Sequence, residues 1–78
     1  MPHVMKLPPL GQTIEEAKMT EWLVPEGELV EKDEPLLVVE TDKGSLEVNA
    51  DAGGTVKRHL VKIGIMVKIG DAVAEIES

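Results

Sequence analysis

The sequence contains no cysteine, tyrosine or phenylalanine, and Trp22 is its only large aromatic residue. Without cysteine, the chain forms neither disulfides nor zinc–thiolate centres, and it has no thiol of its own for redox chemistry. Any thiol chemistry must therefore come from an attached group. The 42% hydrophobic content consists mostly of valine, isoleucine, leucine and alanine, which favours a compact β fold with aliphatic layers.

Basic residues are also scarce, since 8 Lys and Arg stand against 15 Asp and Glu, for a net charge of -7. Nucleic acids and anionic membranes bind clustered Lys and Arg, so we expect neither as a partner, and a basic protein surface is the better electrostatic match. No apolar run approaches the roughly 20 residues of a membrane span. Pro8 and Pro9 break the N-terminal apolar segment, so we expect no secretory signal.

The length of 78 residues allows one small domain. We expect it to occupy residues 1–78, either by itself or as the N-terminal module of a longer chain. We expect strands at residues 3–7, 18–24, 29–30, 36–41, 45–50, 55–61, 66–67 and 72–77, with a surface loop at 10–16. Alternation in 18–24 sets Met19 and Trp22 on opposite sides of the strand, and we expect Trp22 to pack on the core.

The centre of this pattern is a predicted hairpin. The strand at 36–41 is rich in aliphatic and β-branched residues, the strand at 45–50 alternates apolar and polar, and a tight turn joins them. Gly44 falls at the fourth turn position, which predicts a positive φ and a bulge. Lys43 stands at the tip, so its amine projects into water from a stiff support.

The two halves of the chain repeat with a shift of 37 residues. The shift aligns Leu23 with Leu60, Gly27 with Gly64, Val30 with Val67, and Glu40 with Glu77. Two copies are too few for a solenoid but suit a sandwich whose two halves are related by a pseudo-twofold axis. Because Glu40 leads into the lysine turn and Glu77 leads out of the domain, we expect that turn and the C-terminus at opposite poles.

No catalytic or metal-binding constellation is present. The hydroxyl residues show no nucleophile-elbow or triad setting, and the glycines form no phosphate-binding loop. His3 and His59 are too far apart in sequence to indicate a metal site, and alignment of His59 with Trp22 favours a structural or surface role. The charged turn at 31–35 lacks the spacing of a calcium loop. We therefore expect a carrier that enzymes act upon, not an enzyme.

Four short motifs occur in the order found in one known family. They are Leu10-Gly11-x-Thr13, Trp22 before Gly27, Glu40-Thr41-Asp42-Lys43, and Gly54-Thr55-Val56. In these motifs the chain resembles the lipoyl domain of the acyltransferase (E2) component of 2-oxo acid dehydrogenase complexes. The resemblance implies an all-β fold, a flattened barrel or sandwich of two small antiparallel sheets with internal pseudo-twofold symmetry, known as the lipoyl/biotinyl barrel-sandwich hybrid.

The resemblance also assigns roles to residues. It implies that Lys43 carries lipoic acid in amide linkage, on a turn shaped by Glu40, Thr41, Asp42 and Gly44. It further implies that the loop before the second strand lies beside the lysine turn and helps the dehydrogenase recognise the domain. The loop residues concerned are Gly11, Gln12, Thr13, Ile14 and Glu15.

The partners that the resemblance implies are a lipoate ligase or lipoyl transferase, a thiamine-dependent 2-oxo acid dehydrogenase, an acyltransferase core and the flavin enzyme dihydrolipoyl dehydrogenase. The domain itself is then a monomer without catalytic residues, and the parent chain is a dihydrolipoamide acyltransferase. The expected location is the cytoplasm of a bacterium or archaeon, or the mitochondrial matrix, and not the outside of the cell.

The chain departs from the family pattern at Ala17, Gly44, Ile63 and Ile65, and the two isoleucines predict apolar surface beside Gly64. Three alternatives remain. A biotin carrier has the same fold, but its lysine usually lies between methionines, whereas Asp42 and Gly44 flank Lys43. The lipoate carrier of glycine cleavage is usually longer. An unmodified structural or interaction module would leave Lys43 bare.

Overall fold

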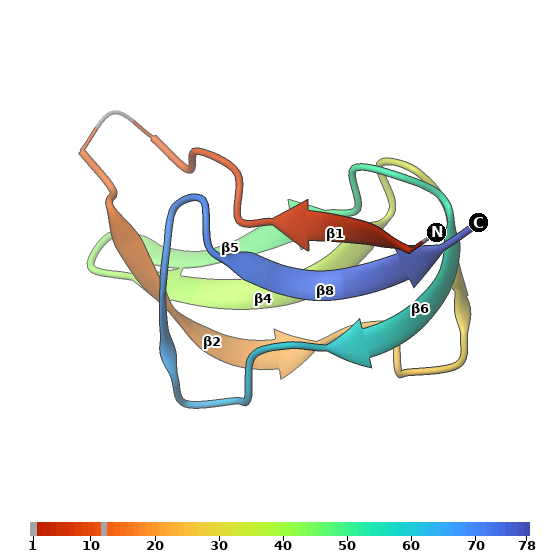
Figure 1. Ribbon diagram of the computed structural model, residues 1–78. Helices are drawn as coiled ribbons and strands as arrows, with labels where there is room; N and C mark the ends of the chain where they lie inside the picture. Colours follow the sequence, from red (N-terminus) through yellow and green to blue (C-terminus); the bar gives the residue numbers. More distant parts are fainter. Residues whose placement is uncertain (1, 12) are drawn as a thin grey trace.

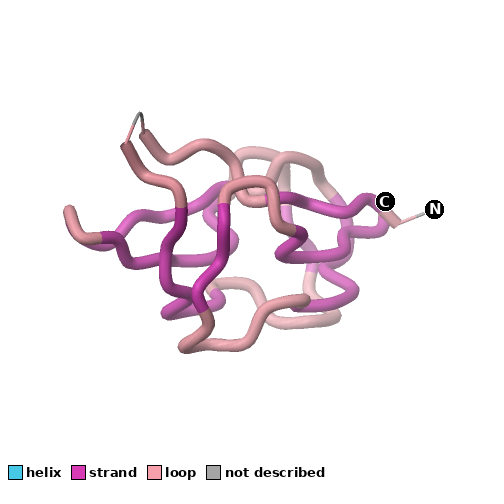
Figure 2. The backbone as a smooth tube through the Cα atoms, turned by 60° about the vertical axis from the view of Figure 1, so that its left-hand side comes forward, coloured by secondary structure: helices cyan, strands magenta, loops and turns pink. Residues whose placement is uncertain are grey.

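The computed structural model describes residues 2–11 and 13–78, and within them the chain forms strands, turns and loops without a helix (Figure 2). None of the described segments is therefore a helix that could span a membrane. The strands, in chain order, are β1 (His3–Lys6), β2 (Glu16–Trp22), β3 (Leu29–Val30), β4 (Pro35–Thr41), β5 (Gly44–Asn49), β6 (Gly54–His59), β7 (Met66–Lys68) and β8 (Ala72–Glu77).

The strands form two antiparallel sheets that face each other as the layers of a sandwich (Figure 1). One sheet has the order β5-β4-β2-β7 and the other the order β1-β8-β6-β3. The predicted all-β sandwich of two small antiparallel sheets is confirmed.

The core between the sheets is aliphatic. In β4, Leu36, Leu37 and Val39 are fully buried, and the equivalent positions of β8 are buried as well. Leu36 and Leu37 are consecutive, so simple alternation would expose one of them. A register shift between Pro35 and Leu37 turns both side chains inward. No polar side chain is buried in the described part of the chain, so apolar packing alone fills the interior.

The predicted pseudo-twofold symmetry is confirmed by matching backbone hydrogen bonds. The Gly27 amide donates to the Val56 carbonyl at 2.7 Å, and the Gly64 amide donates to the Met19 carbonyl at the same distance. The two glycines have φ values of 91° and 96°, which favour glycine over other residues. Strands β2, β3 and β4 thus correspond to β6, β7 and β8, and β5 lies where β1 lies in the other sheet.

Trp22 and His59, which the repeat aligns, stack on each other. Their ring centroids lie 3.8 Å apart with an interplanar angle of 6°. Trp22 Nε1 donates to the Val61 carbonyl at 3.1 Å, and His59 Nε2 lies 2.9 Å from the Val24 carbonyl, which only accepts. The expectation that Trp22 packs on the core is confirmed, and His59 has a structural position.

The alternation expected for residues 18–24 is wrong beyond Met19, where a bulge interrupts it. Strand β2 begins at Glu16 instead, and its register with β4 shifts between Met19 and Glu21. At this bulge the Thr20 hydroxyl donates to the Val38 carbonyl at 3.0 Å. The extra residue turns the strand, so that Met19 is buried and Trp22 also packs against the core.

Candidate functional site

A two-residue loop, Asp42 and Lys43, joins β4 to β5. The register of this hairpin runs without a break from Leu37–Val48 to Thr41–Gly44. Gly44 has the predicted positive φ, at 124°, but the predicted bulge at Gly44 is wrong. It is absent because Gly44 pairs directly with Thr41 and so continues the ladder.

The Thr41 side chain fixes the loop from inside. Its hydroxyl accepts a hydrogen bond from the Lys43 amide at 3.1 Å and donates one to the Gly44 carbonyl at 3.1 Å. These two bonds hold the backbone on both sides of Lys43, as hydroxyl side chains commonly do in turns. The tip is therefore a fixed platform for the lysine side chain.

We expect Thr41→Val to lower the free energy of unfolding by about 1 kcal/mol, because the substitution removes both hydroxyl bonds while keeping the shape of the side chain. Thr41→Ser keeps the hydroxyl and serves as the control. Urea unfolding of the three proteins measures the difference. Equal stability of Thr41→Val and the wild type would show that the hydroxyl does not hold the turn.

The Lys43 side chain is exposed, and its amine reaches the loop between β1 and β2. Lys43 Nζ donates to Thr13 Oγ1 at 3.2 Å. The family resemblance predicted that this loop lies beside the lysine turn, and the contact confirms it. The particular bond between Lys43 and Thr13, two residues 30 positions apart, was not predicted. The structure thus sets the loop residue Thr13 against the lysine at the hairpin tip.

A hollow of about 500 Å³ lies beside the tip. Of the loop residues predicted to help recognition, the lining of this hollow includes Thr13, Ile14 and Glu15 but not Gly11. Gln12 lies outside the described residues. Carboxylates outnumber cations in the lining, so the surface next to the lysine is acidic. The full lining consists of Thr13, Ile14, Glu15, Glu16, Lys18, Glu40, Thr41, Asp42 and Met66.

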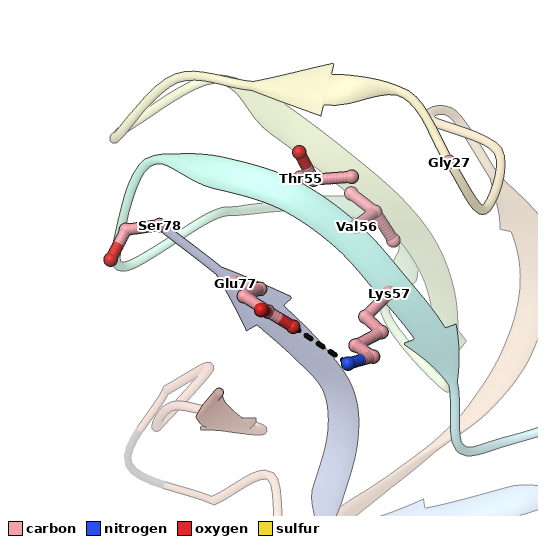
Figure 3. A pocket seen from close by; sticks show the side chains of 6 residues that line it. All are labelled: Gly27, Thr55, Val56, Lys57, Glu77 and Ser78. Carbon is pink, nitrogen blue, oxygen red and sulfur yellow. Dashed lines mark hydrogen bonds and ion pairs between the residues drawn. The ribbon is translucent and has the colours of Figure 1, made fainter. Parts of the chain in front are cut away.

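A second hollow, of about 490 Å³, lies at the chain's C-terminal end (Figure 3). Lys57 Nζ and a Glu77 carboxylate oxygen form an exposed ion pair there at 2.7 Å. Hydrogen bonding to Glu77, together with its negative charge, raises the pKa of Lys57. The same bond and the ammonium charge lower the pKa of Glu77. Each partner of the pair thus favours the charged form of the other.

The lysine turn and the C-terminus lie at opposite ends of the sandwich, as predicted (Figure 1). The long axis of the domain measures 33 Å. The hollow at the C-terminal end is thus remote from Lys43, and the candidate site comprises the hairpin tip, Thr13 and the hollow beside them.

The site presents an amine at its surface. No group of three or more metal-binding side chains occurs among residues 2–11 and 13–78. What the fold provides is one amine on a rigid tip, open to solvent and bordered by an acidic hollow. A two-sheet pseudo-symmetric sandwich that presents a lysine in this way defines the class of biotinyl and lipoyl carrier domains.

Comparisons with known proteins agree with this class. The model of the biotin/lipoyl family, described as "Biotin-requiring enzyme", matches residues 3–76. The chain belongs to this family. Its relatives include the succinyltransferase component of the 2-oxoglutarate dehydrogenase complex of Rickettsia typhi, 41% identical over 90% of this chain. The acetyltransferase component of the pyruvate dehydrogenase complex of Staphylococcus aureus is 31% identical over 100% of this chain.

Solved structures show the same fold. The lipoyl domain of the 2-oxoglutarate dehydrogenase complex from Azotobacter vinelandii is 28% identical, with a TM-score of 0.72 over 96% of this chain and 95% of that one. Urea carboxylase from Kluyveromyces lactis is 25% identical, with a TM-score of 0.82 over 99% of this chain and 6% of that one. The chain spans only 18% of the length of the two acyltransferase relatives. It is a lipoyl-type domain similar to those of acyltransferase components.

Proposed function

We propose that the domain is a lipoyl carrier, with Lys43 as the residue that bears lipoic acid in amide linkage. The observation that carries the proposal is the placement of Lys43 on a two-residue turn held by Thr41, at the pole opposite the C-terminus. A ligase must choose one lysine among several exposed ones, and a rigid protruding tip gives it a geometric basis for that choice. The relatives named above, which include acyltransferase components, support the same role.

The residues of the tip fit an attached arm. The Lys43 amine is exposed, and nothing lies within 4 Å of the position where Gly44 would bear a Cβ, so the tip leaves room for an enzyme to approach. For the modification, Nζ must lose a proton and attack a carboxyl group that the ligase has activated. An amide forms, the activating group leaves, and the lysine charge disappears. The amide N–H stays a donor, so the bond to Thr13 can persist.

The attached group would supply the dithiol chemistry that a chain without cysteine lacks. The chain's own contribution is to hold the root of the arm at the tip and to present an acidic surface around it. Tethering raises the local concentration of the arm at successive active sites. We propose that these sites belong to a thiamine-dependent 2-oxo acid dehydrogenase, an acyltransferase core and dihydrolipoyl dehydrogenase.

A biotin carrier is the second candidate. The description of the matched family names biotin, and the urea carboxylase structure superposes on nearly the whole chain. Asp42 and Gly44 next to Lys43 favour the lipoyl reading, because an acidic neighbour replaces the methionine that biotin carriers usually have at that position.

Parallel incubations distinguish the two candidates. The purified domain is treated with lipoate, ATP and a lipoate ligase, or with biotin, ATP and a biotin ligase, and each product is examined by intact mass and peptide mapping. We expect one lipoyl group, on the peptide that contains Lys43, and no biotin. A biotin adduct, or a lipoyl group on another lysine, would contradict the proposal.

A further inference from the structure

The Lys43 amine has a neutral hydrogen-bond partner although carboxylates lie around it. Nζ donates to the Thr13 hydroxyl at 3.2 Å. Two ion pairs occur in the part of the chain that the structure describes, and neither includes Lys43. A hydroxyl, and not a carboxylate, therefore holds the amine. The carboxylate side chains in the lining of the adjacent hollow are Glu15, Glu16, Glu40 and Asp42.

A neutral partner is one that a modified lysine can keep. Acylation of Nζ replaces the ammonium with a secondary amide, which has no charge and a single N–H. An ion pair such as that of Lys57 with Glu77 would then lose the attraction between its charges. A hydroxyl oxygen accepts from an amide N–H as it does from an ammonium. The bond to Thr13 would therefore become weaker but keep both its donor and its acceptor.

Both partners of this bond have support from their own segments. The two hydroxyl bonds of Thr41 fix the backbone on either side of Lys43. The loop is tied down two residues after Thr13, where the Glu15 carbonyl accepts a hydrogen bond from the Ile69 amide at 3.0 Å. The Thr13 hydroxyl thus faces the lysine from a segment that is itself attached to the sandwich.

We propose that Thr13 anchors the root of the attached arm, because its hydroxyl accepts a hydrogen bond from the amide N–H of modified Lys43. The inference rests on the proposed function and adds a positioning residue to it. An amide group is planar, so Cε and the N–H that points to Thr13 occupy two of the three directions at Nζ. The acyl carbon takes the third. The bond thus fixes the direction in which the arm leaves the tip, while the bonds beyond the amide rotate freely.

This role of Thr13 differs from the one that the family resemblance implies. The resemblance predicted that Thr13 helps a dehydrogenase recognise the domain, which concerns the surface of a partner. The anchor acts through Lys43 of the same chain and before any partner binds. An arm with fewer starting directions has less conformational entropy to lose when an enzyme binds it.

Proton exchange at the modified side chain tests the anchor. The domain is prepared with ¹⁵N-labelled lysine and lipoylated, and peptide mapping checks that Lys43 carries the group. The N–H at Nζ is then followed by NMR, since a hydrogen-bonded proton exchanges with water only when its bond opens. We expect exchange in the wild type to be about two- to tenfold slower than in Thr13→Val, which lacks the hydroxyl but keeps the shape of the side chain. Thr13→Ser should restore the slow rate.

A remote variant and a second modification complete the test. Thr55→Val removes a hydroxyl at the C-terminal pole and should leave the exchange rate at Lys43 unchanged (Figure 3). A domain that carries an acetyl group on Nζ of Lys43, introduced during translation, has the same kind of amide and needs no ligase. A ligase that leaves Lys43 bare would contradict the proposed function alone, because the acetylated domain would still decide the role of Thr13. Equal exchange rates in the wild type and Thr13→Val would overturn the anchor.

Discussion

Lys43→Arg should give a domain that folds like the wild type and accepts no lipoyl group. Arginine keeps the positive charge and nearly the length of the side chain, but its guanidinium is protonated at all ordinary pH values and does not form the amide. Lys43 is exposed, and its side-chain bond to Thr13 lies at the surface, so the substitution should change the free energy of unfolding by less than about 0.5 kcal/mol. The loss of modification should be complete.

The measurement is intact mass after incubation with lipoate, ATP and a lipoate ligase, together with urea unfolding of the unmodified proteins. Lys57→Arg is the matched control, since Lys57 is also an exposed lysine with a hydrogen-bonded amine but lies in β6, at the C-terminal pole. We expect full lipoylation of Lys57→Arg. Residual lipoylation of Lys43→Arg would mean that the ligase recognises a lysine elsewhere on this surface.

Gly54→Ala should be among the most destabilising single substitutions in the domain. Gly54 begins β6 with a φ of 153°, and a Cβ there would lie 2.5 Å from the Glu77 carbonyl oxygen. That oxygen belongs to the backbone of the neighbouring strand β8 and cannot move without breaking the ladder. Backbone strain alone costs about 1–3 kcal/mol, and the clash adds to it. A domain of this size has only about 4–12 kcal/mol of stability in total.

The control for this experiment is Gly27→Ala. Gly27 has a φ of 91°, but nothing lies within 4 Å of a Cβ built there. Its substitution should therefore cost only the conformational strain, about 1–2 kcal/mol. Urea unfolding should rank the wild type first, Gly27→Ala second and Gly54→Ala last. Equal costs for the two alanines would mean that β8 yields at Glu77 and that the close approach is not a constraint.

Much of the fold could be predicted from the sequence because its signals are local or repeated. Aliphatic and β-branched runs gave most strands, and β3 and β8 occur with the predicted bounds. The shift of 37 residues predicted the pseudo-twofold sandwich, since glycines and apolar residues recur at the same spacing. The position of Lys43 at a hairpin tip followed from the turn residues around it.

The features that the sequence did not predict depend on contacts between distant segments. The bulge at Thr20 arises from pairing with β4, and a period-two pattern carries no sign of it. The bond from Lys43 to Thr13 depends on how two loops pack. The acidic hollow likewise combines residues from both halves of the chain. Their chemistry is visible in the sequence, but their grouping exists only in the folded domain.

The stack of Trp22 on His59 also makes the domain its own optical reporter. Trp22 is the sole indole, and it lies against a ring from the other half of the repeat. The fluorescence of Trp22 therefore depends on whether its ring stays stacked on His59. Separation of the two rings on unfolding would change the emission without any added dye. The Gly54 and Thr41 variants can be compared through this single native signal.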